Sequence, residues 1–115
     1  MSAFGSKLRK ADQGMVLFRC PGCRSAHQIR VDPAFGSAWG FNGDGDRPTF
    51  TPSVLVRGSQ RLTEEEYERV IAGETITAAP LICHSFVTDG RIQFLGDCTH
   101  ELVGQTVDLP DWVIE

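Results

Sequence analysis

Four cysteines are the residues of this chain whose type and spacing suggest chemistry. Cys20 and Cys23 are separated by Pro21-Gly22, and Cys83 and Cys98 lie far downstream. Zinc takes four ligands in a tetrahedron and favours thiolates. Two thiols separated by two residues can bind one metal from a single turn, and Pro-Gly suits such a turn. We therefore expect one Zn²⁺ ion, held by the four cysteines.

The fourth ligand of this predicted zinc site has alternatives. Cys83 and Cys98 flank a predicted hairpin with Asp89-Gly90 as its turn. Because side chains alternate between the two faces of a strand, Cys98 is expected on the same face of the hairpin as Cys83 (the same parity), and the two thiols can meet at its open end. His100 shares that parity and His84 is adjacent to Cys83. Either imidazole could replace Cys98 in a Cys₃His site.

The same thiols have interpretations without a metal. A redox Cys-x-x-Cys pair normally lies where a strand runs into a helix N-terminus, whereas here Arg24-Ser25 leads into a second predicted strand. Two disulfides would require secretion, and residues 1–10 lack the apolar segment of a signal peptide. We therefore expect reduced thiols in a cytoplasmic protein. Metal binding is favoured over redox chemistry and over burial without a metal.

The elements that must position these ligands are mostly strands. Apolar and β-branched runs predict strands at residues 15–19, 26–31, 54–56, 81–87, 91–95 and 105–109. One helix is expected, because Thr63 and Glu66 form a capping box and Gly73 ends the periodic pattern. Because an isolated helix of this length is only marginally stable, its apolar face should pack on the sheet. The predicted fold class is mainly β (α+β): a small antiparallel sheet with a zinc-ribbon-like knuckle and one short helix.

Length and charge limit the remaining choices. A chain of 115 residues fits one domain. We expect residues 1–13 to form a flexible N-terminal arm and residues 14–115 to form a single zinc-stapled, β-rich domain. No run is long enough to cross a membrane. The net charge of −4 offers no basic stripe for a nucleic acid backbone.

Several runs, taken together and in order, point to a known family. They begin with Cys20-Pro21-Gly22-Cys23 and continue at residues 39–43, 47–53, 83–92, 97–100 and 104–107. In this order they resemble a family of small, uncharacterised proteins of tailed phages and prophages, some of which carry the label "ammonia monooxygenase". The resemblance implies a phage or prophage protein in the cytoplasm of a bacterial host, and it assigns no activity. The residues give that label no support, since they offer neither a membrane span nor a copper site.

The function that these observations favour is a non-enzymatic zinc domain that binds a host or phage protein. Such a module could modulate a host enzyme or counter a host defence. A site closed by four protein ligands is typical of structural zinc. A zinc hydrolase or deaminase is an alternative, but the His-x-Glu of zinc deaminases is absent. A nucleic-acid-binding zinc ribbon is a third, and the charge argues against it.

One group besides the cysteines could perform acid–base chemistry. If the ligands are the four cysteines, His84 projects from the opposite face of the strand to Cys83. Asp97 could then orient its imidazole, with His100 just beyond. We favour the interpretation in which Asp97 and His100 close the corner by hydrogen bonds to the backbone. We therefore assign no catalytic residue from the sequence.

Overall fold

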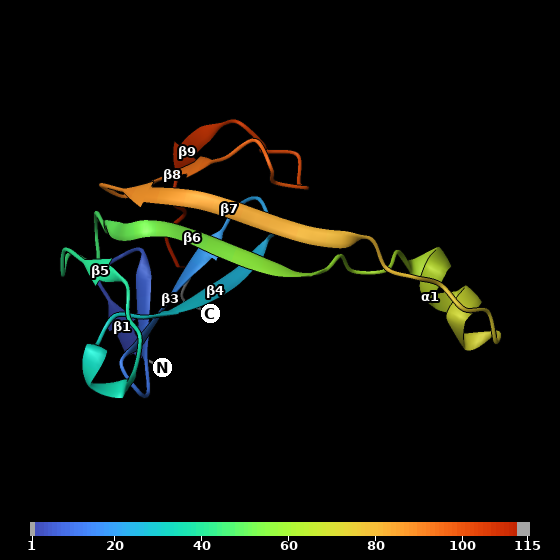
Figure 1. The fold of residues 1–115 in the computed structure, drawn as a ribbon, viewed down its shortest axis with the longest axis horizontal. Coiled ribbons are helices and arrows are strands. Elements are labelled where there is room, and N and C mark those ends of the chain that lie inside the picture. The colour runs from blue at the N-terminus through green and yellow to red at the C-terminus, as the bar shows by residue number, and fades with distance from the viewer. Residues whose placement is uncertain (1, 113–115) are drawn as a thin grey trace.

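The computed structural model describes residues 2–112 as two antiparallel sheets and one α-helix (Figure 1). The first sheet has the order β1 (Ser2–Phe4), β2 (Leu8–Ala11), β3 (Met15–Cys20) and β4 (Ser25–Arg30). The second has the order β5 (Gly40–Phe41), β6 (Phe50–Ser59), β7 (Pro80–Thr88), β8 (Arg91–Phe94) and β9 (Thr106–Asp108). A short 3₁₀ helix, η1 (Pro33–Phe35), joins them. The predicted fold class is confirmed, with two sheets in place of one.

Residues 2–11 form strands where the sequence predicted a flexible arm. β1 pairs with β2 and β2 pairs with β3, with Leu8 opposite Phe18. Both of these side chains are fully buried. Leu8 stands between Lys7 and Arg9, so no apolar pattern marks the segment, and only pairing with β3 buries it. Met1 and residues 113–115, the outer ends of the predicted arm and domain, lie outside the described residues.

A single cluster of buried apolar side chains joins the two sheets. Phe18 from β3 stacks on Phe50 from β6, with ring centroids 6.0 Å apart. Val87 on β7 and Ile92 on β8 contribute to the same cluster and are fully buried. The cluster also includes the thiols of Cys20, Cys83 and Cys98. The cysteines therefore lie at the junction of the sheets.

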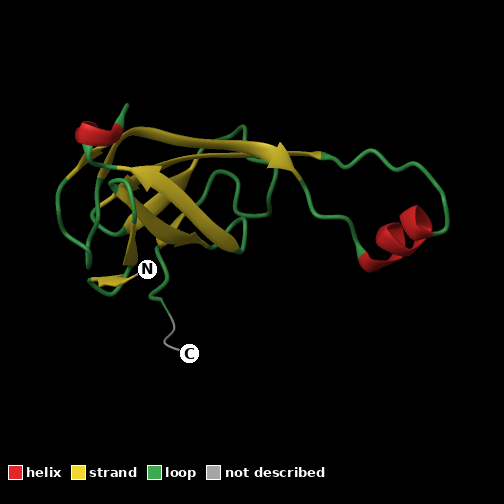
Figure 2. Cartoon of the chain, turned by 90° about the horizontal axis from the view of Figure 1, so that it is seen from below, coloured by secondary structure: helices red, strands yellow, loops and turns green. Residues whose placement is uncertain are grey.

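The helix α1 (Glu64–Ile71) projects from the end of the long β6–β7 hairpin, away from both sheets (Figures 1 and 2). Its capping box of Thr63 and Glu66 is present, as predicted. None of its residues is buried, and Tyr67 and Ile71 are 58% and 69% exposed. This differs from the predicted docking on the sheet, because pairing between β6 and β7 continues to Ser59 and Pro80 and carries the helix outward. Within residues 2–112, no helix has the length and apolar character needed to span a bilayer.

The β7–β8 hairpin has the predicted turn and register. Asp89 and Gly90 both have positive φ, at 53° and 78°. Val87 lies opposite Ile92, and Ser85 opposite Phe94. β8 ends at Phe94, and residues 95–100 then turn along the edge of β7. The alternation of side chains therefore stops before Cys98.

Candidate active site and metal centre

Three thiols and one imidazole converge at the junction of the two sheets. Cys20 ends β3, and Cys23 lies in the turn of residues 21–24 between β3 and β4, which we call the knuckle. Cys83 lies on β7, and His100 follows the corner after β8. One ligand atom from each lies within 4.8 Å of the others. The sulfurs of Cys20 and Cys83 are 3.7 Å apart. Two thiolates on a tetrahedral zinc, each about 2.3 Å from the metal, would stand about 3.8 Å apart, so the spacing suits such an ion.

His100 occupies the fourth position of this cluster, and Cys98 lies outside it. The Cys98 thiol donates to the carbonyl of His84 at 3.2 Å and accepts the backbone N–H of His84 at 3.3 Å. The next residue, Thr99, donates its N–H to the carbonyl of Ile82 at 2.9 Å. The parity that suggested Cys98 as the fourth ligand requires an extended chain, and the chain is turning here. The geometry therefore favours the alternative ligand, His100.

The surroundings of His100 suit a metal ligand. Its Nε2 is buried and has no hydrogen-bond partner among the described residues. The ring packs edge-on against Phe94, with centroids 4.4 Å apart, and its Nδ1 accepts the backbone N–H of Leu102 at 3.3 Å. Metal binding through Nε2 requires the ring proton on Nδ1, so this contact is given up when an ion binds. A Cβ atom at Gly22 would overlap the imidazole. Glycine in the knuckle therefore lets the His100 ring approach the turn closely.

The thiols of the cluster differ in acidity. The hydrogen bond from Cys83 holds the pKa of the Cys20 thiol at about 4, although burial opposes this shift. The same hydrogen bond, with Cys83 as donor, raises the pKa of Cys83. Burial chiefly raises the pKa of Cys23 to about 11. Cys20 is thus a ready thiolate at neutral pH, whereas Cys23 and Cys83 must lose a proton when a metal binds.

A second polar group lies on the other side of β7. The hydroxyl of Ser53 is 2.8 Å from Nε2 of His84. The Nδ1 of the same ring is 3.1 Å from a carboxylate oxygen of Asp97. Ser53 lies where β6 regains its register after an irregularity, and the indole N–H of Trp39 donates to its carbonyl at 3.0 Å. Hydroxyl, imidazole and carboxylate therefore form one hydrogen-bonded chain.

The hydrogen-bonded series of hydroxyl, imidazole and carboxylate has the order needed to activate a nucleophile. When Asp97 accepts the Nδ1 proton, the lone pair of Nε2 faces Ser53 and can receive the proton of its hydroxyl. The His84 and Asp97 side chains are 26% and 52% exposed, so the group is open to a substrate. A hydroxyl within reach of a base, which a third group orients, is typical of nucleophilic catalysis.

Sequence reasoning found part of this group and missed its hydroxyl, Ser53. It placed His84 opposite Cys83 and beside Asp97, and the structure has this contact. His100, the third member considered there, belongs to the metal cluster. Ser53 was missed because its register against β7 depends on how a loop of 20 residues between Ser59 and Pro80 closes. One signal was available, because Ser53, His84 and Asp97 all fall within the runs that carried the family resemblance.

The two groups share strand β7 and the corner that follows β8. Cys83 and His84 are consecutive and point to opposite faces of β7, one toward the metal cluster and the other toward Ser53. Asp97 and His100 likewise come from one corner and serve different groups. The candidate metal centre and the hydrogen-bonded chain are thus built back to back.

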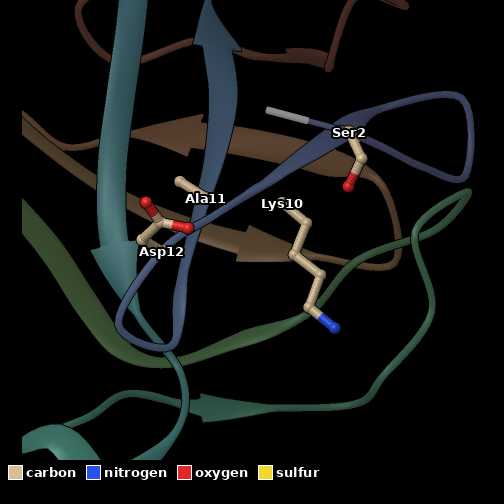
Figure 3. A pocket seen from close by; sticks show the side chains of 4 residues that line it. All are labelled: Ser2, Lys10, Ala11 and Asp12. Carbon is tan, nitrogen blue, oxygen red and sulfur yellow. The ribbon is translucent and has the colours of Figure 1, made fainter.

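A hollow elsewhere on the surface contains neither group. It has a volume of about 420 Å³ and is lined by Ser2, Lys10, Ala11 and Asp12. Figure 3 shows these side chains on β1, β2 and the turn that follows. No imidazole or thiol lines it, so it offers no comparable chemistry.

Comparison with known proteins yields one family. Residues 4–95 match the model of the family described as bacterial ubiquitination-like system serine protease (BubE). The matched segment contains Ser53 and His84 and ends just before Asp97. No curated protein and no solved structure matches the chain. The matched description names a bacterial system and does not mention a phage.

Proposed function

Because this chain belongs to the BubE family of bacterial ubiquitination-like system serine proteases, we propose that it is a serine protease with Ser53 as its nucleophile. His84 is the general base and Asp97 orients it. The observation that carries this proposal is the continuous chain from Ser53 through His84 to Asp97, with contacts of 2.8 and 3.1 Å. The sequence favoured a binding role because a zinc site closed by four protein ligands is typical of structural zinc, and the contact between Ser53 and His84 supports a separate catalytic group.

The proposed reaction follows the acyl-transfer scheme. The Ser53 oxygen attacks the substrate carbonyl carbon while its proton passes to Nε2 of His84. The imidazolium is stabilised by the Asp97 carboxylate, and it then protonates the leaving group as the scissile bond breaks. Water attacks the resulting acyl-enzyme, again giving its proton to His84, and release of the acid restores the Ser53 hydroxyl.

We propose that the second group binds one Zn²⁺ through Cys20, Cys23, Cys83 and His100. The spacing of the sulfurs and the unpartnered Nε2 of His100 support this. Four protein ligands leave no open position, so the ion has a structural role. It joins the knuckle of the first sheet to β7 of the second and thereby fixes the strand that carries His84.

Covalent labelling tests the nucleophile directly. A fluorophosphonate probe should label the native protein at Ser53, because the activated oxygen displaces fluoride from phosphorus. Ser53→Ala should abolish labelling, and His84→Ala should slow labelling and hydrolysis of p-nitrophenyl acetate by at least about 10³-fold. Ser59→Ala, at the far end of the same strand, is the matched control and should behave as the native protein. Labelling at another residue would contradict the assignment of Ser53.

A specific observation also supports a binding role for α1. The helix presents Tyr67, Val70 and Ile71 to solvent at the end of the β6–β7 hairpin. We propose that this face holds a protein substrate of the ubiquitination-like system while the triad cuts it. Ile71→Asp should then slow cleavage of the protein substrate about tenfold and leave p-nitrophenyl acetate hydrolysis at the native rate. If Ile71→Asp and the native protein cleave the protein substrate at equal rates, this role for α1 is contradicted.

A further inference from the structure

Two exposed apolar side chains flank the candidate triad on its own face of the sheet. Leu55 on β6 lies directly opposite His84 on β7. Phe86 lies two residues beyond His84, and so on the same face of β7. Each is 42% exposed. On the opposite face of these strands, Val54, Ser85 and Val87 are buried in the core.

The contact with His84 places the Ser53 hydroxyl on the same face as these two side chains. The Ser53 oxygen is 2.8 Å from Nε2 of His84, and the strand around Ser53 is irregular between Phe50, which lies opposite Val87, and Val54, which lies opposite Ser85. Leu55 is two residues further along the same strand as Ser53. Ser53, Leu55, His84 and Phe86 thus lie on one face of the two paired strands. A substrate carbonyl bound at Ser53 therefore lies near Leu55 and Phe86.

We propose that Leu55 and Phe86 form a subsite for an apolar side chain next to the scissile bond of an extended substrate segment. This inference rests on the proposed protease activity and concerns its specificity. Half-exposed Leu and Phe side chains lose further contact with water when an apolar residue covers them, which favours such substrates over those with glycine at that position.

Small synthetic substrates can measure this preference on both sides of the bond. For the acyl side, the probes are the p-nitrophenyl esters of N-acetylglycine and N-acetylleucine. For the leaving-group side, the acyl-enzyme is partitioned between glycinamide and leucinamide as acceptors. The native protein should favour the leucine member of at least one pair by about tenfold in kcat/KM or in product ratio.

Matched variants assign that preference to the subsite. Leu55→Ser and Phe86→Ser should bring the leucine-to-glycine ratio toward one. Phe35→Ser, an apolar-to-polar change at an exposed position on η1, should retain the native ratio. Thermal unfolding at the native temperature would show that the variants are folded, as expected for side chains at the surface.

The outcomes separate the subsite from the protease activity. If the native protein hydrolyses both esters with no preference on either side, the subsite is refuted and the nucleophile stands. If the leucine preference survives in both subsite variants, Leu55 and Phe86 are not its cause, and the proposal is overturned. If hydrolysis does not exceed that of Ser53→Ala, the proposed function itself fails and the subsite fails with it.

Discussion

At the scale of single residues, the Cys98 thiol contacts the backbone of His84, a member of the candidate triad, at a point where β8 no longer pairs with β7. β8 ends at Phe94, so β7 has no backbone partner for the N–H of His84. The Cys98 thiol takes that place, accepting this N–H and donating to the carbonyl of the same residue. The adjacent Asp97 is thereby set against the His84 ring. Cys98, which the sequence predicted as a metal ligand, thus contacts the backbone of His84 in the structure, and we expect it to position the imidazole of that residue.

This arrangement predicts opposite results for two neighbouring residues. Cys98→Ala should retain zinc but lower kcat about tenfold or more, because the His84 N–H loses its partner and the ring shifts. Cys98→Ser should recover most of kcat, because a hydroxyl can also donate and accept. His100→Ala should instead release zinc. Metal analysis of purified variants, beside their kcat and KM values, checks all three. Zinc loss from Cys98→Ser would show that Cys98 is the ligand.

At the scale of elements, the knuckle depends on the close approach of His100 to the turn between β3 and β4. A side chain at Gly22 would collide with the imidazole, whereas Gly96, in the corner after β8, has open space around it. The two glycines therefore offer a matched pair of substitutions. Gly22 lies between Cys20 and Cys23, and Gly96 lies four residues before His100, but only Gly22 faces the imidazole.

Gly22→Ala should weaken zinc binding about ten- to hundredfold, because the added methyl group displaces His100 from the thiols. Gly96→Ala should leave zinc binding at the native level. Competition with a chromophoric chelator measures both affinities. Equal affinities in the two variants would mean that His100 does not bind the metal.

At the scale of the whole molecule, the candidate metal centre lies between the two sheets. Cys20 and Cys23 come from the first sheet and Cys83 from the second. The apolar cluster between the sheets surrounds the same point. A metal bound at this point would tie the two halves of a small fold together and would hold β7, which carries His84, against the turn between β3 and β4. Stability and activity should therefore depend on the ion together.

Removal of the metal by a strong chelator should lower the free energy of unfolding by about 3 kcal/mol or more and abolish ester hydrolysis. Added Zn²⁺ should restore both. Because the pKa of Cys23 is raised to about 11, zinc must displace its proton, so zinc retention should fall as the pH is lowered. Thermal unfolding with and without chelator measures the effect. An unchanged melting temperature would refute the structural role.

The sequence by itself determined the local features of this protein. The knuckle at Cys20 and Cys23, the capping box at Thr63 and the turn at Asp89-Gly90 each depend on residues close in the chain. Such features follow from spacing and backbone preference, which the sequence displays. The alternation of apolar residues likewise determined that the fold is mainly β.

Only the tertiary structure decided which distant residues meet. Ser53 and His84 come together because β6 pairs with β7, although residues 60–79, which include α1, separate the two strands in the sequence. No local pattern specifies the register between β6 and β7. The choice between Cys98 and His100 depends on where β8 ends, because the alternation that links Cys98 to Cys83 holds only along an extended chain and the chain turns after Phe94. The exposure of α1 depends on how far the β6–β7 pairing runs. Contacts over long separations are set by the packing of whole sheets, and the candidate triad and metal centre both consist of such contacts.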